Sequence, residues 1–201
     1  MCTNDERDQL GEILKRGASH AAHALAQLIG KNVMIGVPIV HMDTIEHVAA
    51  QMGDPGTIMT AILMNVHGKA RGVFFLMFPK SSAEKITGLM TGNREKEINV
   101  FDPFNRSALQ EVGNILAGSS LAALSVFSGL SFLQSVPEVV TDTRGAILNS
   151  ILLELGEHAR SILLLNVKVV IEEEASGDLF FFFDKEAMTN MLSAVEQKST
   201  S

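Results

Sequence analysis

The chain has 201 residues, 46% apolar and 19% charged, which suffices for one buried core, and its net charge of −7 without any Lys/Arg cluster argues against binding to nucleic acid. The longest apolar run, 162–171, is interrupted by Asn166 and Lys168 and is too short to span a bilayer, so we expect no membrane insertion. No signal-peptide pattern opens the chain, and the single cysteine, Cys2, cannot form an internal disulfide, which predicts a cytoplasmic protein.

The first half of the sequence predicts a long helix, a strand, a short helix, a hairpin and a further helix. Gly30 is expected to end the first helix, and Pro38 to close the first strand or move it to a sheet edge. Ser81 and Glu84 form a capping pattern for the last helix of this half. The expected elements are helix 5–29, strand 33–37, helix 44–52, hairpin strands 57–67 and 70–78, and a helix from 81 to about 91.

The second half predicts the same order of elements after a polar stretch, 92–100, that is the candidate linker. Asp102 as N-cap, with Pro103 at the first helical position, predicts the start of the second long helix. The four phenylalanines 180–183 fit a strand that is covered on both faces. The expected elements are helix 103–128, strand 132–136, hairpin strands 161–173 and 179–183, and helix 185–195; for the apolar run 147–155, helix and strand are both open.

An internal repeat relates the two halves at an offset of 99 residues. Nine of the 33 positions in 8–40 are identical to their counterparts in 107–139, without a gap. This period is longer than that of solenoid repeats, and it predicts one domain, 1–201, built from repeat one (5–91) and repeat two (102–195). We therefore expect an α+β fold with pseudo-twofold symmetry, in which the two long helices pack side by side on a mainly antiparallel sheet.

The second long helix carries a polar stripe. Ser107, Glu111 and Asn114 are four and three residues apart, so that all three lie, with Gly118, within about 60° of one line along the helix. The opposite side is predicted to pack against the core and consists of Leu109, Val112, Leu116, Ser120, Ala123 and Phe127.

Small residues accompany the polar stripe, although glycine is costly inside a helix by about 1 kcal/mol. Gly113, Ala117 and Gly118 stand beside Glu111 and Asn114. We interpret them as room for another surface to approach the stripe. Glu-x-x-Asn alone is common on solvated helix faces, and the spacing by itself does not indicate a catalytic site.

The pattern Ser107-x3-Glu111-x2-Asn114-x22-Pro137 resembles the signature of the CheC/CheX/FliY phosphatases of chemotaxis. The first half nearly repeats it as Asp8-x3-Glu12-x2-Lys15-x22-Pro38, with Lys15 where the family has Asn. The resemblance covers almost the whole chain. Two halves in one chain are more similar to CheC than to the single-motif CheX, and an extra C-terminal flagellar-switch domain, as in FliY, is not expected.

The resemblance implies hydrolysis of the aspartyl phosphate on a CheY-like response regulator in two-component signalling. In this reading Asn114 orients the attacking water, Glu111 docks on a lysine of the regulator, and Ser107 and Pro137 support them. The protein itself is expected to need no cofactor, because Mg²⁺ is expected on the regulator. The first site, with Asp8, Glu12, Lys15 and Pro38, is read as degenerate, since an ammonium group cannot accept a hydrogen bond from water.

The sequence allows two other interpretations. A non-catalytic adaptor would use the same helices to bind a response regulator, or the receptor deamidase CheD, which is a possible partner in this family. A metal site at His20 and His23, three residues apart, lacks a third ligand at matching spacing, so that solvated or partly packed histidines are expected.

Overall fold

The computed structural model describes residues 4–36, 39–43, 45–68, 71–93, 98–155, 162–172, 175–183, 186–187, 189–191 and 193. The elements of the first half are α1 (Asn4–Ile29), β1 (Val33–Ile35), β2 (Ile39–Asp43), α2 (Ile45–Gln51), β3 (Ile58–Gly68), β4 (Gly72–Pro79) and α3 (Lys80–Thr91). Those of the second half are α4 (Pro103–Ser128), β5 (Phe132–Gln134), β6 (Glu138–Thr143), α5 (Arg144–Leu155), β7 (Ile162–Ile171) and β8 (Ala175–Phe183). The described residues from 186 onward are helical and lie within the helix predicted over 185–195.

The described strands form a single eight-stranded antiparallel sheet in the order β1-β7-β8-β4-β3-β5, with β2 also pairing with β7 and β6 with β3. At its centre β4 of the first half pairs with β8 of the second, where the rings of Phe75 and Phe180 stack with centroids 4.6 Å apart. The outer strands cross between the halves: β1 and β2 pair with β7, whereas β5 and β6 pair with β3. Each half therefore extends the hairpin of the other.

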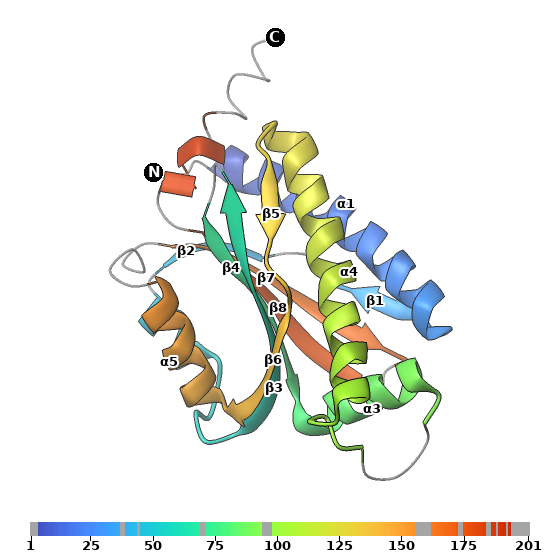
Figure 1. Cartoon of the computed structure of the whole chain (residues 1–201). Helices are drawn as coiled ribbons and strands as arrows, with labels where there is room; N and C mark the ends of the chain where they lie inside the picture. Colours follow the sequence, from blue (N-terminus) through green and yellow to red (C-terminus); the bar gives the residue numbers. More distant parts are fainter. Residues whose placement is uncertain are drawn as a thin grey trace.

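Helices cover both faces of this sheet. α1 and α4 run side by side over one face together with α3, while α5 lies over the opposite face (Figure 1), where it packs with α2. Successive phenylalanines of β8 enter the two different cores: Phe181 and Phe183 face α1 and α4, and Phe180 and Phe182 face α2 and α5. The predicted α+β fold, with two long helices on a mainly antiparallel sheet, is confirmed, as is a strand covered on both faces.

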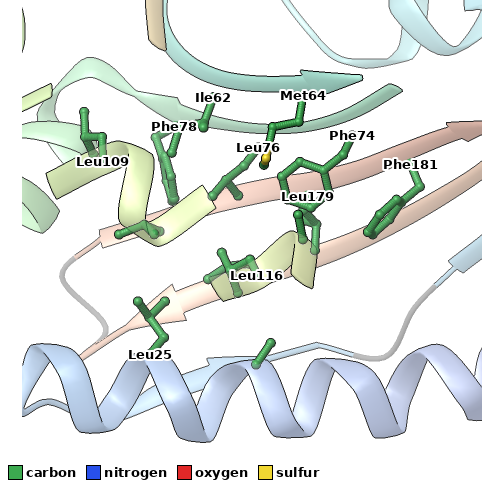
Figure 2. Packing of buried hydrophobic residues seen from close by; sticks show 14 of the residues in the cluster. Leu25, Ile62, Met64, Phe74, Leu76, Phe78, Leu109, Leu116, Leu179 and Phe181 are labelled. Atoms are coloured by element: carbon green, nitrogen blue, oxygen red, sulfur yellow. The ribbon is translucent and has the colours of Figure 1, made fainter. Parts of the chain in front are cut away.

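The larger core lies between the sheet and the two long helices. Figure 2 shows Leu25 of α1 and Leu109 and Leu116 of α4 pointing toward side chains from three strands. The strand residues labelled there are Ile62, Met64, Phe74, Leu76, Phe78, Leu179 and Phe181. All of these side chains are buried, and burial of a large aliphatic or aromatic side chain stabilises a fold by about 1.5–3 kcal/mol.

Local chemistry sets both ends of α4 and the C-terminal end of α1, as predicted for Asp102, Pro103 and Gly30. The Asp102 carboxylate accepts hydrogen bonds from the backbone N–H groups of Phe104 (3.0 Å) and Asn105 (3.3 Å), and Pro103 occupies the first helical position. Gly129 ends α4 in the left-handed conformation (φ 68°), and Gly30 takes the same conformation after α1 (φ 69°). The start and end of α4 are therefore fixed, and so is the position of its polar stripe along the helix axis.

Several local predictions need correction. α3 begins at Lys80 without a side-chain cap, because β4 continues to Pro79 and leads directly into the helix; Glu84 lies near the Lys80 ammonium (3.5 Å) and does not cap. The strand expected over 132–136 ends at Gln134, and strands β2 and β6 were not predicted. The undecided run 147–155 belongs to helix α5. Lys69, between the predicted hairpin strands 57–67 and 70–78, lies outside the described residues.

No described helix is both long enough and apolar enough to cross a bilayer.

Candidate functional site

The motif residues of the second half lie along α4, as the helical spacing predicts. Ser107 and Glu111 are exposed, and Asn114 and Gly118 are half-buried where α4 meets the segment after β5. On the opposite side Leu109, Val112 and Leu116 are fully buried. The polar stripe is thus accessible at its N-terminal end and flanked by protein at its C-terminal end.

Glu111 is an accessible carboxylate on α4. Its side chain is exposed and, within the part of the chain that the structure describes, has no hydrogen bond or ion pair. A carboxylate that is already accessible and unpaired can bind an external cation without first breaking an internal contact.

The amide of Asn114 is held from the side by the strand next to it. Gln134, the last residue of β5, donates a hydrogen bond from Nε2 to Asn114 Oδ1 (3.4 Å). Gln110, one turn earlier on α4, donates from Nε2 to the backbone carbonyl of Pro137 (2.7 Å). The segment 134–137 is therefore fastened to α4 at two successive turns of the helix.

The two residues expected to play supporting roles face different partners. The hydroxyl of Ser107 donates to the Pro103 carbonyl (2.9 Å), one turn back in the same helix and away from Glu111. Pro137 is buried between β5 and β6, and its carbonyl accepts the hydrogen bond from Gln110. In this structure, Pro137 belongs to the segment that lies beside α4, whereas the Ser107 hydroxyl makes its hydrogen bond within its own helix.

The corresponding stripe of the first half lies on the neighbouring helix. α1 approaches α4 so closely that a Cβ added to Gly17 would lie 2.7 Å from the Cβ of Ala123. Glu12 and Lys15 are both exposed and form an ion pair with each other, with Nζ 3.3 Å from Oε1. Position 8 lies in α1, and Pro38 falls outside the described residues.

The interpretation of the small residues was wrong for two of the three. A Cβ added to Gly113 would lie 2.6 Å from Cγ2 of Ile62 on β3, and Ala117 is fully buried, so both allow α4 to pack closely on the sheet. Gly118 differs from these two, because a Cβ added to it would lie 4.0 Å from Gln134 Oε1, an ordinary van der Waals contact. Helix position explains the difference: Gly113 and Ala117 lie on the inner side, and Gly118 on the polar stripe.

Gln110 and Gln134 were not identified from the sequence. Glutamine on a helix or strand carries no motif signal, and their contacts depend on β5 lying against α4. The internal repeat contains one signal that could have identified them. The residues 99 positions earlier, Gly11 and Ile35, have no side-chain hydrogen-bond donor, so both glutamines are specific to the second half.

No group of three His, Cys, Asp or Glu side chains that could hold a metal ion is present among the described residues. His20 and His23 are both exposed, and the ring of His23 shares a hydrogen bond with Gln27 (3.1 Å).

Comparison with known proteins identifies relatives of this arrangement. The family model "Chemotaxis phosphatase CheX" matches residues 59–152. The CheY-P phosphatase CheC of Bacillus subtilis (strain 168) is 34% identical over 160 residues, which are 77% of this chain and 77% of the relative.

Two solved structures show the same fold at lower sequence identity. FliY of Thermotoga maritima superposes with a TM-score of 0.77 at 20% identity and covers 98% of both chains. A chain of the CheX–CheY–BeF3–Mg²⁺ complex from Borrelia burgdorferi matches with a TM-score of 0.56 at 16% identity, over 87% of this chain and 97% of that chain. Together with the Ser107–Pro137 motif, of which Ser107, Glu111 and Asn114 lie on α4, the identity to CheC over most of both sequences shows that this chain belongs to the CheC/CheX/FliY family of chemotaxis phosphatases.

Proposed function

We propose that this protein dephosphorylates the aspartyl phosphate of a CheY-like response regulator at the site on α4 formed by Glu111 and Asn114. The relative that is 34% identical is a CheY-P phosphatase, and a structural relative was solved with CheY. The observation that carries the assignment to α4 is the contrast between the two stripes. Glu111 is accessible and unpaired in the described structure, whereas Glu12 is engaged by Lys15.

The reaction needs a water molecule placed in line with the phosphorus–oxygen bond to the aspartate. The water oxygen forms the new bond to phosphorus, the electron pair of the broken bond stays on the aspartate carboxylate, and a water proton is released as inorganic phosphate forms. Such a transfer depends mainly on positioning and charge stabilisation. Asn114 suits this task because an amide can accept a hydrogen bond from the water and donate one to a phosphoryl oxygen.

Glu111 serves as the docking group for a lysine of the regulator. It precedes Asn114 by three residues, so its carboxylate lies on the same helix face about one turn away. Mg²⁺ bound to the regulator would neutralise the negative charge that develops on the phosphoryl group, and the two residues on α4 would need no cofactor of their own.

The decisive experiment measures the rate at which a phosphorylated CheY-like regulator loses its phosphate in the presence of each variant. Loss of a group that orients the reacting water costs about 3 kcal/mol, so Asn114→Ala should slow the reaction by about 10² or more. Lys15→Ala is the matched control on α1 and should leave the rate unchanged.

A wild-type rate for Asn114→Ala would overturn the assignment. If Glu12→Ala then abolished activity, the first stripe would be the working site. The wild type and all variants could instead bind the regulator normally without accelerating phosphate loss. In that case the adaptor interpretation, with a response regulator or CheD as the partner, would replace the phosphatase proposal.

A further inference from the structure

Gln134 occupies a position from which it can control the orientation of the Asn114 amide. Its Nε2 donates to Asn114 Oδ1 (3.4 Å), and its Oε1 lies 4.0 Å from a Cβ placed on Gly118. The side chain therefore lies between two successive turns of the polar stripe. The bond is long for a neutral hydrogen bond, as is common for catalytic hydrogen bonds before the partner binds.

The backbone that carries Gln134 is fixed on both sides. Gln134 stands opposite Val66 in the β3–β5 pairing. Ser135 then exchanges two bonds with Asn65: its N–H donates to the Asn65 carbonyl (2.9 Å), and its hydroxyl accepts from the Asn65 N–H (3.0 Å). Gln110 holds the Pro137 carbonyl at the far end of the segment. Because its backbone is held in this way, the Gln134 side-chain amide can act as a hydrogen-bond donor that keeps a neighbouring amide in one orientation.

We propose that Gln134 is a positioning residue for Asn114, an inference that rests on the proposed phosphatase function. By donating to Oδ1, Gln134 occupies one of the two lone pairs of that oxygen and directs the amide nitrogen away from β5. The second lone pair remains available to the attacking water, and the nitrogen to a phosphoryl oxygen. Without Gln134 the amide could rotate and present the wrong group, since its oxygen and nitrogen differ little in shape.

The first half lacks a side-chain hydrogen-bond donor at the position equivalent to Gln134. Its strand β1 ends at Ile35, which corresponds to Gln134 at the 99-residue offset, and Ile35 packs against the larger core. An aliphatic side chain there cannot donate to position 15. The first site therefore lacks both the amide of Asn114 and the donor of Gln134, and we expect Lys15→Asn alone to leave it inactive.

The loss-of-function test replaces Gln134 with methionine, which has a similar length but no N–H donor. Gln134→Met should lower kcat for dephosphorylation about 10- to 100-fold, because a small misplacement of a reacting group has effects of that size, while KM stays near the wild-type value. In the Asn114→Ala background the same substitution should have no further effect, since the group that it positions is gone. An effect of equal size in both backgrounds would mean that Gln134 only maintains the local structure, and would overturn the proposal.

A gain-of-function test uses the first half. In the Asn114→Ala background, Lys15→Asn combined with Ile35→Gln should raise the rate about tenfold or more, and neither substitution alone should do so. Equal activity of Lys15→Asn with and without Ile35→Gln would contradict the requirement for a side-chain donor. Thermal unfolding shows whether Ile35→Gln is tolerated in the core, and if it is not, the Gln134→Met cycle decides.

The two proposals fail in different ways. If Asn114→Ala dephosphorylates the regulator normally, the proposed function fails together with this inference. If Asn114→Ala is slow but Gln134→Met has the wild-type kcat, only the role of Gln134 is wrong.

Discussion

Glu111 and Glu12 occupy equivalent positions of the repeat but differ in their neighbours. Glu12 has the Lys15 ammonium at 3.3 Å, whereas Glu111 has no partner in the described structure. An exposed ion pair of this kind is worth only about 0–1 kcal/mol, so it does not lock Glu12 in place. It does reduce the net negative charge that α1 presents, and a lysine on a docking partner would meet the like charge of Lys15 there.

The docking role of Glu111 predicts that a substitution there changes the affinity for the regulator, whether or not dephosphorylation takes place. Glu111→Lys should weaken association with a phosphorylated CheY-like regulator about tenfold or more, because it places like charges opposite each other. Glu12→Lys is the matched control and should bind normally. Binding is measured by titration with the regulator held in its phosphorylated state by a stable phosphate mimic, and full affinity of Glu111→Lys would exclude Glu111 as the docking group.

A second carboxylate has a structural role that depends on pH. Lys31 donates a hydrogen bond to Glu172 (3.0 Å), and the Asn32 N–H donates another (3.4 Å); these contacts lower the pKa of Glu172 below its ordinary value. Because the pKa is lowered in the folded protein, the stabilisation is present above the ordinary glutamate pKa and is lost as pH falls through the lowered one.

The prediction is that Glu172→Gln destabilises the fold at about pH 7 and that the difference from wild type shrinks below about pH 4. Urea unfolding at a series of pH values measures it. In a Lys31→Met background, where the strongest contact is missing, Glu172→Gln should have a smaller effect at every pH. A difference from wild type that grew on acidification would contradict the assignment.

At the scale of elements, α4 has two glycines in contrasting environments. Gly113 faces Ile62 on β3, where a Cβ would lie 2.6 Å from a methyl carbon, while a Cβ on Gly118 would lie 4.0 Å from Gln134 Oε1, an ordinary van der Waals contact. The close approach at Gly113 brings α4 down onto the sheet, which places Asn114 beside the segment after β5. Packing on the inner side of α4 thus sets the position of Asn114 on its outer side.

The two glycines predict opposite effects on stability. Gly113→Ala should destabilise the protein by about 1–3 kcal/mol, because overpacking forces Ile62 or the helix to shift. Gly118→Ala should stabilise it by up to about 1 kcal/mol, since alanine is the better helix former and meets no obstacle. Chemical denaturation of the two variants compares them directly, and equal effects would show that α4 does not pack on β3 as described.

The ends of α4, which depend on local chemistry, could be predicted from the sequence, whereas strands β2 and β6, which depend on distant partners, could not. Asp102, Pro103 and Gly129 set the ends of α4 through contacts within a few residues. By contrast, β2 and β6 are edge segments that gain their order from β7 and β3, more than 70 residues away. The same distinction holds for the site, since Asn114 follows from the motif while Gln134 becomes relevant only where β5 contacts α4.

At the scale of the whole molecule, the two halves are interleaved. Strands β1 and β2 of the first half complete the hairpin of the second, and strands β5 and β6 of the second half complete the hairpin of the first. The cores on both faces of the sheet also draw residues from each half. Neither half therefore contains a complete set of partners for its own strands.

We predict that neither repeat, 5–91 or 102–195, folds alone as a monomer, and that the two fragments recover the native sheet when mixed. Circular dichroism with denaturant titration measures cooperative unfolding for each fragment and for the mixture, and a phosphatase assay shows whether the mixture recovers the site. Cooperative unfolding of monomeric 5–91 alone would contradict this prediction and would indicate two independent domains.

The crossing of β1 to β7 also affects the order in which the protein can fold during its synthesis. Val33 pairs with Ile171, so the first strand emerges from the ribosome about 140 residues before its partner. At roughly 5–20 residues per second, this gap lasts on the order of ten seconds. During that time α1 and the β3–β4 hairpin can form, but the β1 edge has no native neighbour. The newly made N-terminal half consequently waits in an open state, exposed to chaperones and to other nascent chains, until the last strands of the sheet arrive.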